Sequence, residues 1–88
     1  MRFRVDRERA YWRVLEGEAV VISAETSHYY SLNRTGTFVW NLLAEQALTP
    51  DEVVARVAAR YERPEAQVSG DIRRLLDELA GEGLLAAE

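Results

Sequence analysis

The sequence predicts an α+β domain in which a three-stranded antiparallel sheet is followed by three helices. Three observations predict this order. Between residues 10 and 32, short runs of β-branched and aromatic residues are separated by turn-forming residues. From residue 33 onward, apolar residues recur every three to four positions, as they do on one face of a helix. With 88 residues and 48% hydrophobic residues, the chain can bury the core of one domain.

The first two strands are expected to form a hairpin. Residues 10–15, AYWRVL, and residues 19–22, AVVI, are rich in strand-forming side chains. Between them, Gly17 can take the positive φ that a tight turn requires. Residues 1–9, in which arginines alternate with acidic residues, are interpreted as a partly ordered arm, so the domain itself is expected to span residues 10–88.

A third strand is expected from His28 to Leu32, after the turn AETS. Successive side chains of a strand point to opposite faces. Tyr30 and Leu32 should therefore share one face of the sheet. Tyr29 and Ser31 should lie on the opposite face, so one of these two pairs points inward.

The hydrophobic period changes to about 3.6 after Asn33, which predicts a first helix ending near Glu45. Asn33 is expected to shape the corner between strand and helix. Trp40 lies at the margin of the apolar face and is expected in the core. The residues that share this face are Gly36, Val39, Leu42 and Leu43.

The second helix has a clear start. Thr49 is an N-cap candidate, Pro50 suits the first helical position, and Glu52 completes a T-x-x-E capping box. Its apolar stripe consists of Val53, Val54, Val57, Ala58 and Tyr61.

The third helix is expected to open at Pro64 and to end near Gly81 and Gly83. Leu76 and Leu79 should lie in the core, whereas other apolar residues of the stripe should lie nearer to a cleft. The whole stripe consists of Val68, Ile72, Leu75, Leu76 and Leu79. Three strands packed on three short helices resemble a winged helix-turn-helix with its strands placed first.

The composition argues against several classes of function. The chain has fifteen acidic and eleven basic residues, a net charge of −4, whereas a nucleic-acid binder usually carries a basic surface. The absence of cysteine excludes disulfides, thiolate zinc sites and a cysteine nucleophile. No apolar run approaches the roughly 20 residues of a membrane span. We therefore expect a cytoplasmic protein with no nucleic-acid or membrane partner.

Catalytic machinery is not expected either. His28 is the only histidine, and no serine is tied to it by the sequence. No metal-binding or phosphate-binding motif is present, so no cofactor is expected. Adjacent carboxylates such as Asp51 with Glu52, or Asp77 with Glu78, suit helix capping and solubility. The expected function is recognition without catalysis.

The third strand offers a means of recognition. At the edge of a three-stranded meander its backbone N–H and C=O groups are unpaired, so a peptide can add there as a further strand. Backbone hydrogen bonds would give affinity, and pockets for alternate side chains would give specificity. Aromatic residues beside that strand would wall such a groove, although Tyr29, Tyr30 and Trp40 can equally be core aromatics.

The same residues carry a family resemblance. The run EGEAVVISAETSHYYSLNRTGTFVWNLL resembles the hallmark of the PqqD family, in which YY-x-L-N is followed by G-x-x-V/I-W-x-L-L. The second half is also similar, with T-x-x-E-V-V, then A-x-R-Y, then V-x-x-D-I-x-x-L-L-x-E-L and a final G-L-L. The resemblance covers nearly all of residues 10–85, and the joint order of these short pieces makes it fairly specific.

The resemblance implies a non-catalytic chaperone or adaptor, a recognition element for ribosomally synthesised and post-translationally modified peptides. Such domains bind the leader of a precursor peptide and present it to a modifying enzyme, often a radical S-adenosylmethionine enzyme or a leader peptidase. The leader is added to the third strand and lies against the third helix. Arg74 would pair with an acidic leader residue. Carried onto this sequence, the groove comprises Tyr29, Tyr30, Ser31, Leu32, Val68, Asp71, Ile72, Arg74 and Leu75.

Some alternatives stay open. The product can be pyrroloquinoline quinone, a lasso peptide or another modified peptide, and the edge strand can also pair two copies of the chain into a homodimer. A winged-helix DNA-binding transcriptional regulator is the competing interpretation, favoured by the helix order and by Arg73 and Arg74. Against it, the third helix begins with Glu65 and continues to Asp71, an acidic start that would repel phosphates.

Overall fold

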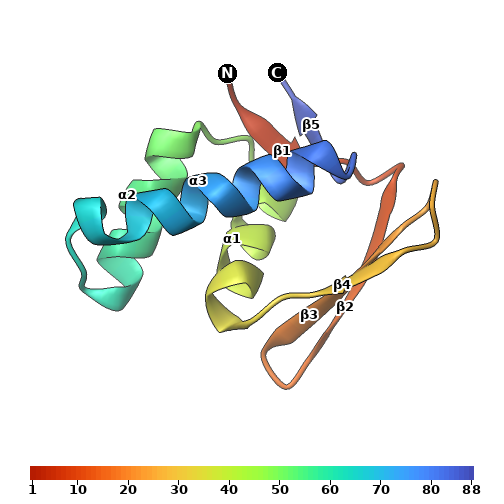
Figure 1. The fold of residues 1–88 in the computed structure, drawn as a ribbon, viewed down its shortest axis with the longest axis horizontal. Helices are drawn as coiled ribbons and strands as arrows, with labels where there is room; N and C mark the ends of the chain where they lie inside the picture. The colour runs from red at the N-terminus through yellow and green to blue at the C-terminus, as the bar shows by residue number, and fades with distance from the viewer.

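The computed structural model describes residues 1–88. Strands β2, β3 and β4 form an antiparallel sheet in that order and precede three helices, which confirms the predicted α+β class. Figure 1 shows this sheet at one side of the molecule and the helices beside it. The elements are β1 (Phe3–Val5), β2 (Ala10–Leu15), β3 (Glu18–Ser23), β4 (Tyr29–Ser31), α1 (Arg34–Glu45), α2 (Pro50–Tyr61), α3 (Glu65–Gly81) and β5 (Leu85–Ala87).

The hairpin between β2 and β3 turns where the sequence predicts. Leu15 pairs with Glu18 across a two-residue loop. Both loop residues have positive φ, 53° at Glu16 and 81° at Gly17, as a type I′ turn requires. This turn matches the twist of the flanking strands and therefore sets the register of the whole hairpin.

The corner from β4 into α1 is held by two polar side chains. Asn33 Oδ1 accepts a hydrogen bond from the Gly36 N–H at 2.8 Å, and a Cβ at Gly36 would lie only 3.3 Å from that oxygen. Thr37, which the sequence did not single out, accepts the Ala19 N–H at 2.8 Å and donates to the Leu32 carbonyl. The helix start is therefore tied both to β3 and to the end of β4.

Helices α2 and α3 pack against each other beside α1, and their axes cross in the view of Figure 1. The predicted capping box is present: the Thr49 hydroxyl accepts the Glu52 N–H, and the Glu52 carboxylate accepts the Thr49 N–H. The second of these bonds, to the Thr49 backbone, is the largest cause that lowers the pKa of Glu52. Pro64 is the N-cap residue of α3, which confirms where this helix begins.

A second, two-stranded sheet was not predicted. Strand β1 pairs with β5 in antiparallel register, with Phe3 opposite Ala87 and Val5 opposite Leu85. On its other side, Phe3 exchanges two backbone hydrogen bonds with Leu48, at 2.8 and 3.0 Å. Residues 1–9, interpreted from the sequence as an arm, thus contribute a strand and the buried Val5 to the core. The two chain ends lie side by side (Figure 1).

The core lies between the inner face of the large sheet and the helices. Trp40 is 0% exposed and packs edge-on against Trp12, with ring centroids 5.4 Å apart. Leu76 and Leu79 are buried, as the sequence predicts, and so are Leu84 and Leu85. None of the helices combines the length and the apolar character that crossing a bilayer would need.

Candidate functional site

The outer edge of β4 is unpaired within the chain. Strand β4 ends the sheet order, and its only neighbour is β3. The Leu32 N–H bonds to the Ala19 carbonyl, and the His28 carbonyl accepts the Ser23 N–H. Because hydrogen-bonded and non-hydrogen-bonded pairs alternate in an antiparallel ladder, Tyr29 and Ser31 direct their N–H and C=O groups away from β3. Four backbone groups therefore face open space on this edge.

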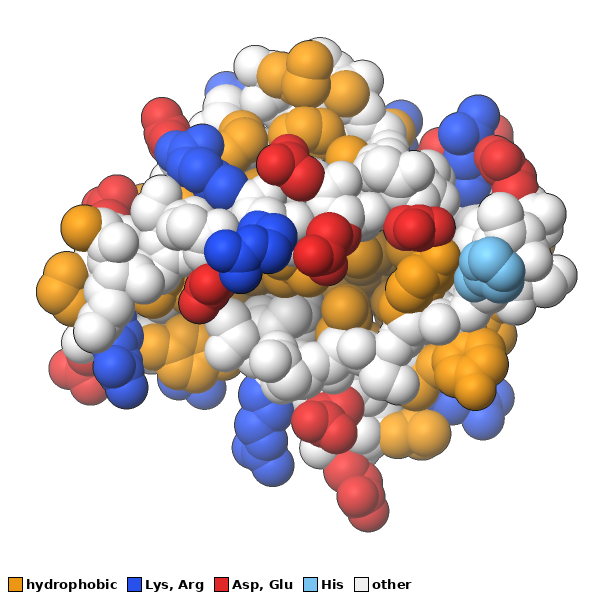
Figure 2. Space-filling model, viewed as in Figure 1, with side chains coloured by type: hydrophobic (Ala, Val, Ile, Leu, Met, Phe, Trp, Pro, Cys, Tyr) orange, Lys and Arg blue, Asp and Glu red, His pale blue; other side chains and the backbone are white.

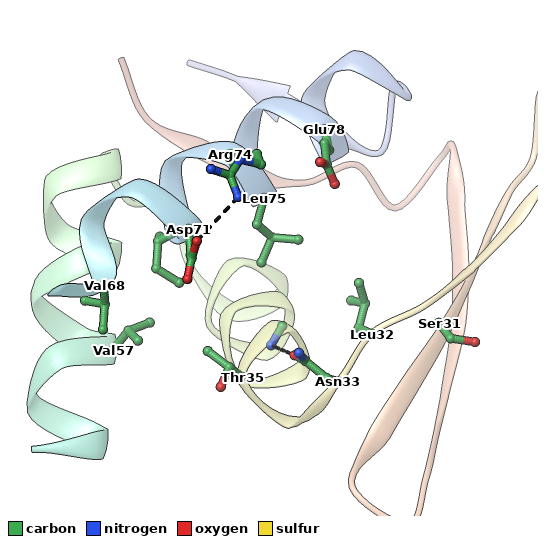
Figure 3. A pocket seen from close by; sticks show the side chains of 12 residues that line it. Ser31, Leu32, Asn33, Thr35, Val57, Val68, Asp71, Arg74, Leu75 and Glu78 are labelled. Carbon is green, nitrogen blue, oxygen red and sulfur yellow. Dashed lines mark hydrogen bonds and ion pairs between the residues drawn. The ribbon is translucent and has the colours of Figure 1, made fainter. Parts of the chain in front are cut away.

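A groove of about 490 Å³ lies between this edge and α3. In Figure 3 the Leu32 side chain lies on one side of it, and Leu75 and Val68 project from α3 on the other. Below them, the start of α1 and the Val57 side chain of α2 close the floor. The lining residues are Ser31, Leu32, Asn33, Thr35, Gly36, Val57, Val68, Asp71, Ile72, Arg74, Leu75 and Glu78.

The groove continues past the start of α1 toward the loop between α2 and α3. A second hollow of about 390 Å³ shares Thr35, Val57, Val68 and Asp71 with the first. It is also lined by Tyr61, Arg63 and Gln67. Together the two hollows make one elongated channel that runs from the end of β4 to the N-terminal end of α3. We call this channel, with the residues that line its two parts, the β4–α3 groove.

Charged side chains form the rim of the groove on the α3 side. Arg74 and Asp71 pair at 3.4 Å, but both side chains are more than 70% exposed, so the pair adds little stability. Glu78 has no ion-pair partner. Figure 2 shows acidic side chains along this rim and apolar side chains in the hollow between α3 and the sheet.

Tyr30 joins the strand to the end of α3. Its hydroxyl donates to a Glu82 carboxylate oxygen at 2.5 Å, and Glu82 follows the C-terminal end of α3, away from Arg63. This hydrogen bond is the main cause that raises the pKa of Tyr30, with desolvation and the negative charge of Glu82 acting in the same direction. The phenol is therefore a stable donor at neutral pH.

Seven of the nine residues predicted for the site line the groove: Ser31, Leu32, Val68, Asp71, Ile72, Arg74 and Leu75. Tyr30 faces the same side as Leu32 but reaches toward Glu82, and Tyr29 lies on the outer face of the sheet with 72% exposure. The alternation predicted for β4 is confirmed, with Tyr30 and Leu32 inward. Ile72 is 3% exposed, so it belongs to the core as well as to the wall of the groove.

Eight lining residues of the groove were not predicted for the site: Asn33, Thr35, Gly36, Val57, Tyr61, Arg63, Gln67 and Glu78. Glu78 could have been predicted from its spacing. It follows Asp71 by seven positions and Arg74 by four, which places all three on one face of a helix. Val57 had none, because it fits the core stripe of the second helix. The only histidine is exposed, and no three potential metal ligands lie together.

The chain is similar to one known family and to solved structures. A family model described as "Coenzyme PQQ synthesis protein D (PqqD)" matches residues 18–85. Among curated proteins, none matches the chain significantly. Among solved structures, "TbiB1 in Complex with the TbiA(beta) Leader Peptide" is similar with a TM-score of 0.83 and 27% sequence identity, over 97% of this chain and 96% of that one.

A second solved structure, "Lasso peptide synthetase B1 complexed with the leader peptide", has a TM-score of 0.77 and 20% identity over 97% of this chain and 98% of that one. At this identity the likeness establishes the fold alone. The fold of this chain thus matches nearly the whole length of both neighbours.

Proposed function

The chain belongs to the PqqD family, and from this premise we propose that it is a non-catalytic adaptor that binds the leader of a ribosomally made precursor peptide. The bound leader is presented to a modifying enzyme, such as a radical S-adenosylmethionine protein or a leader peptidase. The product is pyrroloquinoline quinone or another modified peptide. The binding event takes place without a cofactor, in the cytoplasm.

The observation that carries this proposal is the free β4 edge beside an apolar groove. An extended peptide next to β4 can exchange hydrogen bonds with the backbone of Tyr29 and Ser31. Each such bond contributes about 0.5–1.5 kcal/mol net. Peptide side chains opposite Tyr30 and Leu32 would point into the groove, toward Leu75 and Val68. Those opposite Tyr29 and Ser31 would point to the outer face of the sheet.

The groove supplies the apolar contacts that backbone pairing alone lacks. Leu32 and Ile72 are held by the core and form rigid walls, while Val68 and Leu75 are half-buried and keep surface available to a ligand. Asp71 and Arg74 lie at the rim and can exchange their mutual ion pair for pairs with the leader. The structure solved with the TbiA(β) leader peptide, at 27% identity, supports a leader as the ligand of this chain.

The DNA-binding alternative gains nothing from the structure. The exposed side of α3 carries Asp71, Asp77 and Glu78, and Arg73 is paired with Asp51. A phosphate backbone would meet more negative than positive charge there. A second copy of the chain is the other competing occupant of the β4 edge, and it would compete with the leader for the same backbone groups.

The proposal is tested by titrating labelled leader peptides, taken from short open reading frames next to the gene, into the full chain and measuring fluorescence anisotropy. We expect saturable binding by one of them. Absence of binding by every leader at about 100 μM, a free energy of roughly −5.5 kcal/mol, would contradict the proposal.

Strand addition is tested on the peptide that binds. N-methylation of one peptide amide at a time should weaken binding at every second position, because only alternate amides face β4. Loss at consecutive positions, or at none, would show that the peptide is not bound as a strand. Sedimentation of the free chain and of the complex shows whether a homodimer forms and whether the peptide dissociates it.

A further inference from the structure

The charges along the β4–α3 groove are unequally distributed. At one end, Arg63 lines the groove and takes part in no ion pair. In the middle, Asp71 and Arg74 neutralise each other. At the other end, Glu78 is unpaired and Glu82 is bonded only to the neutral Tyr30 phenol. Among the side chains that line the groove, the unpaired charge is thus positive at one end and negative at the other.

The dipole of α3 is oriented in the same direction as this charge distribution. Helix α3 starts at Glu65 beside the Arg63 end and finishes at Gly81 beside the Glu82 end. The N-terminus of a helix carries partial positive charge and the C-terminus partial negative charge. Glu65 in the first turn of α3 offsets part of the positive charge at that end, whereas the N-terminus of α1 faces the middle of the groove and has no acidic residue in its first turn. The lining side chains Arg63 and Glu78 therefore set the electrostatic gradient along the channel, and the dipole of α3 acts in the same direction.

We infer that this groove selects its peptide by charge order. An acidic side chain would lie over the Arg63 end and a basic side chain over the Glu78 and Glu82 end, with an apolar segment between them. The inference rests on the proposed function, because it specifies the chemistry of the peptide bound at the same site. The apolar middle of the channel, with Leu32, Val57 and Leu75, supplies the part of the binding that is independent of charge.

The direction of β4 predicts which charged residue comes first in the bound peptide. Strand β4 runs from the Glu82 end, where Tyr30 is anchored, toward the start of α1. Antiparallel pairing is the commoner choice for an added strand, and β4 already pairs in this way with β3. A peptide antiparallel to β4 would enter at the Arg63 end. Its acidic residue therefore precedes its basic residue in sequence.

A random 12-residue peptide library displayed on phage tests the inference against the immobilised full chain. We expect the enriched peptides to carry Asp or Glu in their first third, apolar residues in the centre and Lys or Arg in their last third. For a synthetic peptide from this set, exchanging the acidic and basic residues at constant composition should weaken binding about tenfold. The preference should fade in high salt.

Charge-swapped variants supply the control. The double variant Arg63→Glu with Glu78→Arg keeps the net charge and should reverse the order in the enriched peptides. The matched variant Arg4→Glu with Glu88→Arg swaps an ion pair of 2.9 Å on the β1–β5 sheet and should leave the order unchanged. The selected order should thus follow the groove charges and no others.

The outcomes separate the two claims. Enriched peptides that compete with one another but show no charge order would overturn this inference and leave the proposed function standing. A basic-first order on the unaltered protein would also overturn it. No peptide enriched above a parallel selection on the Ser31→Pro variant would count against the proposed function itself.

Discussion

Two short strands of the molecule, β1 and β4, differ in how their edges are paired. Strand β1 is paired on both sides, with β5 along its length and with Leu48 through two hydrogen bonds to Phe3. Strand β4 is paired with β3 only, and its other side faces the groove. A free edge can pair with an added strand, so β4 is available to a ligand in a way that β1 is not. The comparison separates what holds the fold from what is available to a ligand.

The closed strand should carry the larger effect on stability. Leu48 is buried and joins β1 to the segment between α1 and α2. Leu48→Ala should lower the free energy of unfolding by about 2–5 kcal/mol through the lost burial and the cavity. Urea denaturation measures this, with Leu15→Ala at an exposed position as a control that should cost less than about 0.5 kcal/mol. If the folded Leu48→Ala protein also lost peptide affinity, the strand that holds the fold and the edge that is available to a ligand would not be separate.

Proline substitutions probe the two sides of β4. Tyr30→Pro removes an N–H that faces β3, together with the Tyr30 ring and its bond to Glu82, and should destabilise the protein by at least about 1–3 kcal/mol, since it leaves a β3 carbonyl unpaired. Ser31→Pro removes an N–H that faces the open edge and should cost less stability. It should nevertheless weaken peptide binding at least about tenfold. Comparing urea midpoints and anisotropy titrations for both variants checks this, and equal stability losses would mean that the Ser31 N–H is not free.

The wall of the groove should affect binding more than folding. Ile72 is too deeply buried to test this, because a charge there would unfold the core. Leu75 is half-buried, so Leu75→Asp should weaken peptide binding by about 1–3 kcal/mol while the protein stays folded. Ala55→Asp adds the same charge on an exposed position of α2 outside the groove, and it should leave the affinity unchanged. Isothermal titration calorimetry measures both.

The link between Tyr30 and Glu82 should have the smallest effect, and it depends on pH. The hydrogen bond to Glu82 raises the pKa of the Tyr30 phenol above 10.0 in the folded protein. A group with a raised folded-state pKa stabilises the fold fully below its unfolded pKa, and this contribution is lost as the pH rises through the folded-state pKa. Tyr30→Phe should therefore be less stable than the unaltered protein at neutral pH. The difference should shrink above pH 10, which urea midpoints across that range would show.

Much of the fold could be predicted from local signals. Gly17 marks the hairpin turn, and Thr49 with Glu52 marks the start of α2, because each works within a few residues along the chain. Strands β1 and β5 could not be predicted in this way. Each has three residues, and they pair across almost the whole length of the chain, from Phe3 to Ala87. Such pairing depends on tertiary packing, which no local pattern reports.

The groove could be predicted only in part for the same reason. Alternation along β4 correctly separated Leu32 from Tyr29, and helical spacing placed Val68 and Leu75 on one side of α3. Val57 comes from a third element, so its place in the floor depends on how α2 packs beside α3. The wall residue Ile72 serves both core and groove, a double role that periodicity cannot resolve.

The neighbouring chain ends have a practical consequence. Because Arg2 and Glu88 exchange two backbone hydrogen bonds, the polypeptide enters and leaves the domain at one point. A host protein could carry this module as an insertion in a single surface loop, without stretching either connection. Joining the two ends and reopening the exposed turn at Glu16 and Gly17 would give a circular permutant in which β2 and β3 are no longer consecutive, while the β4–α3 groove keeps its shape.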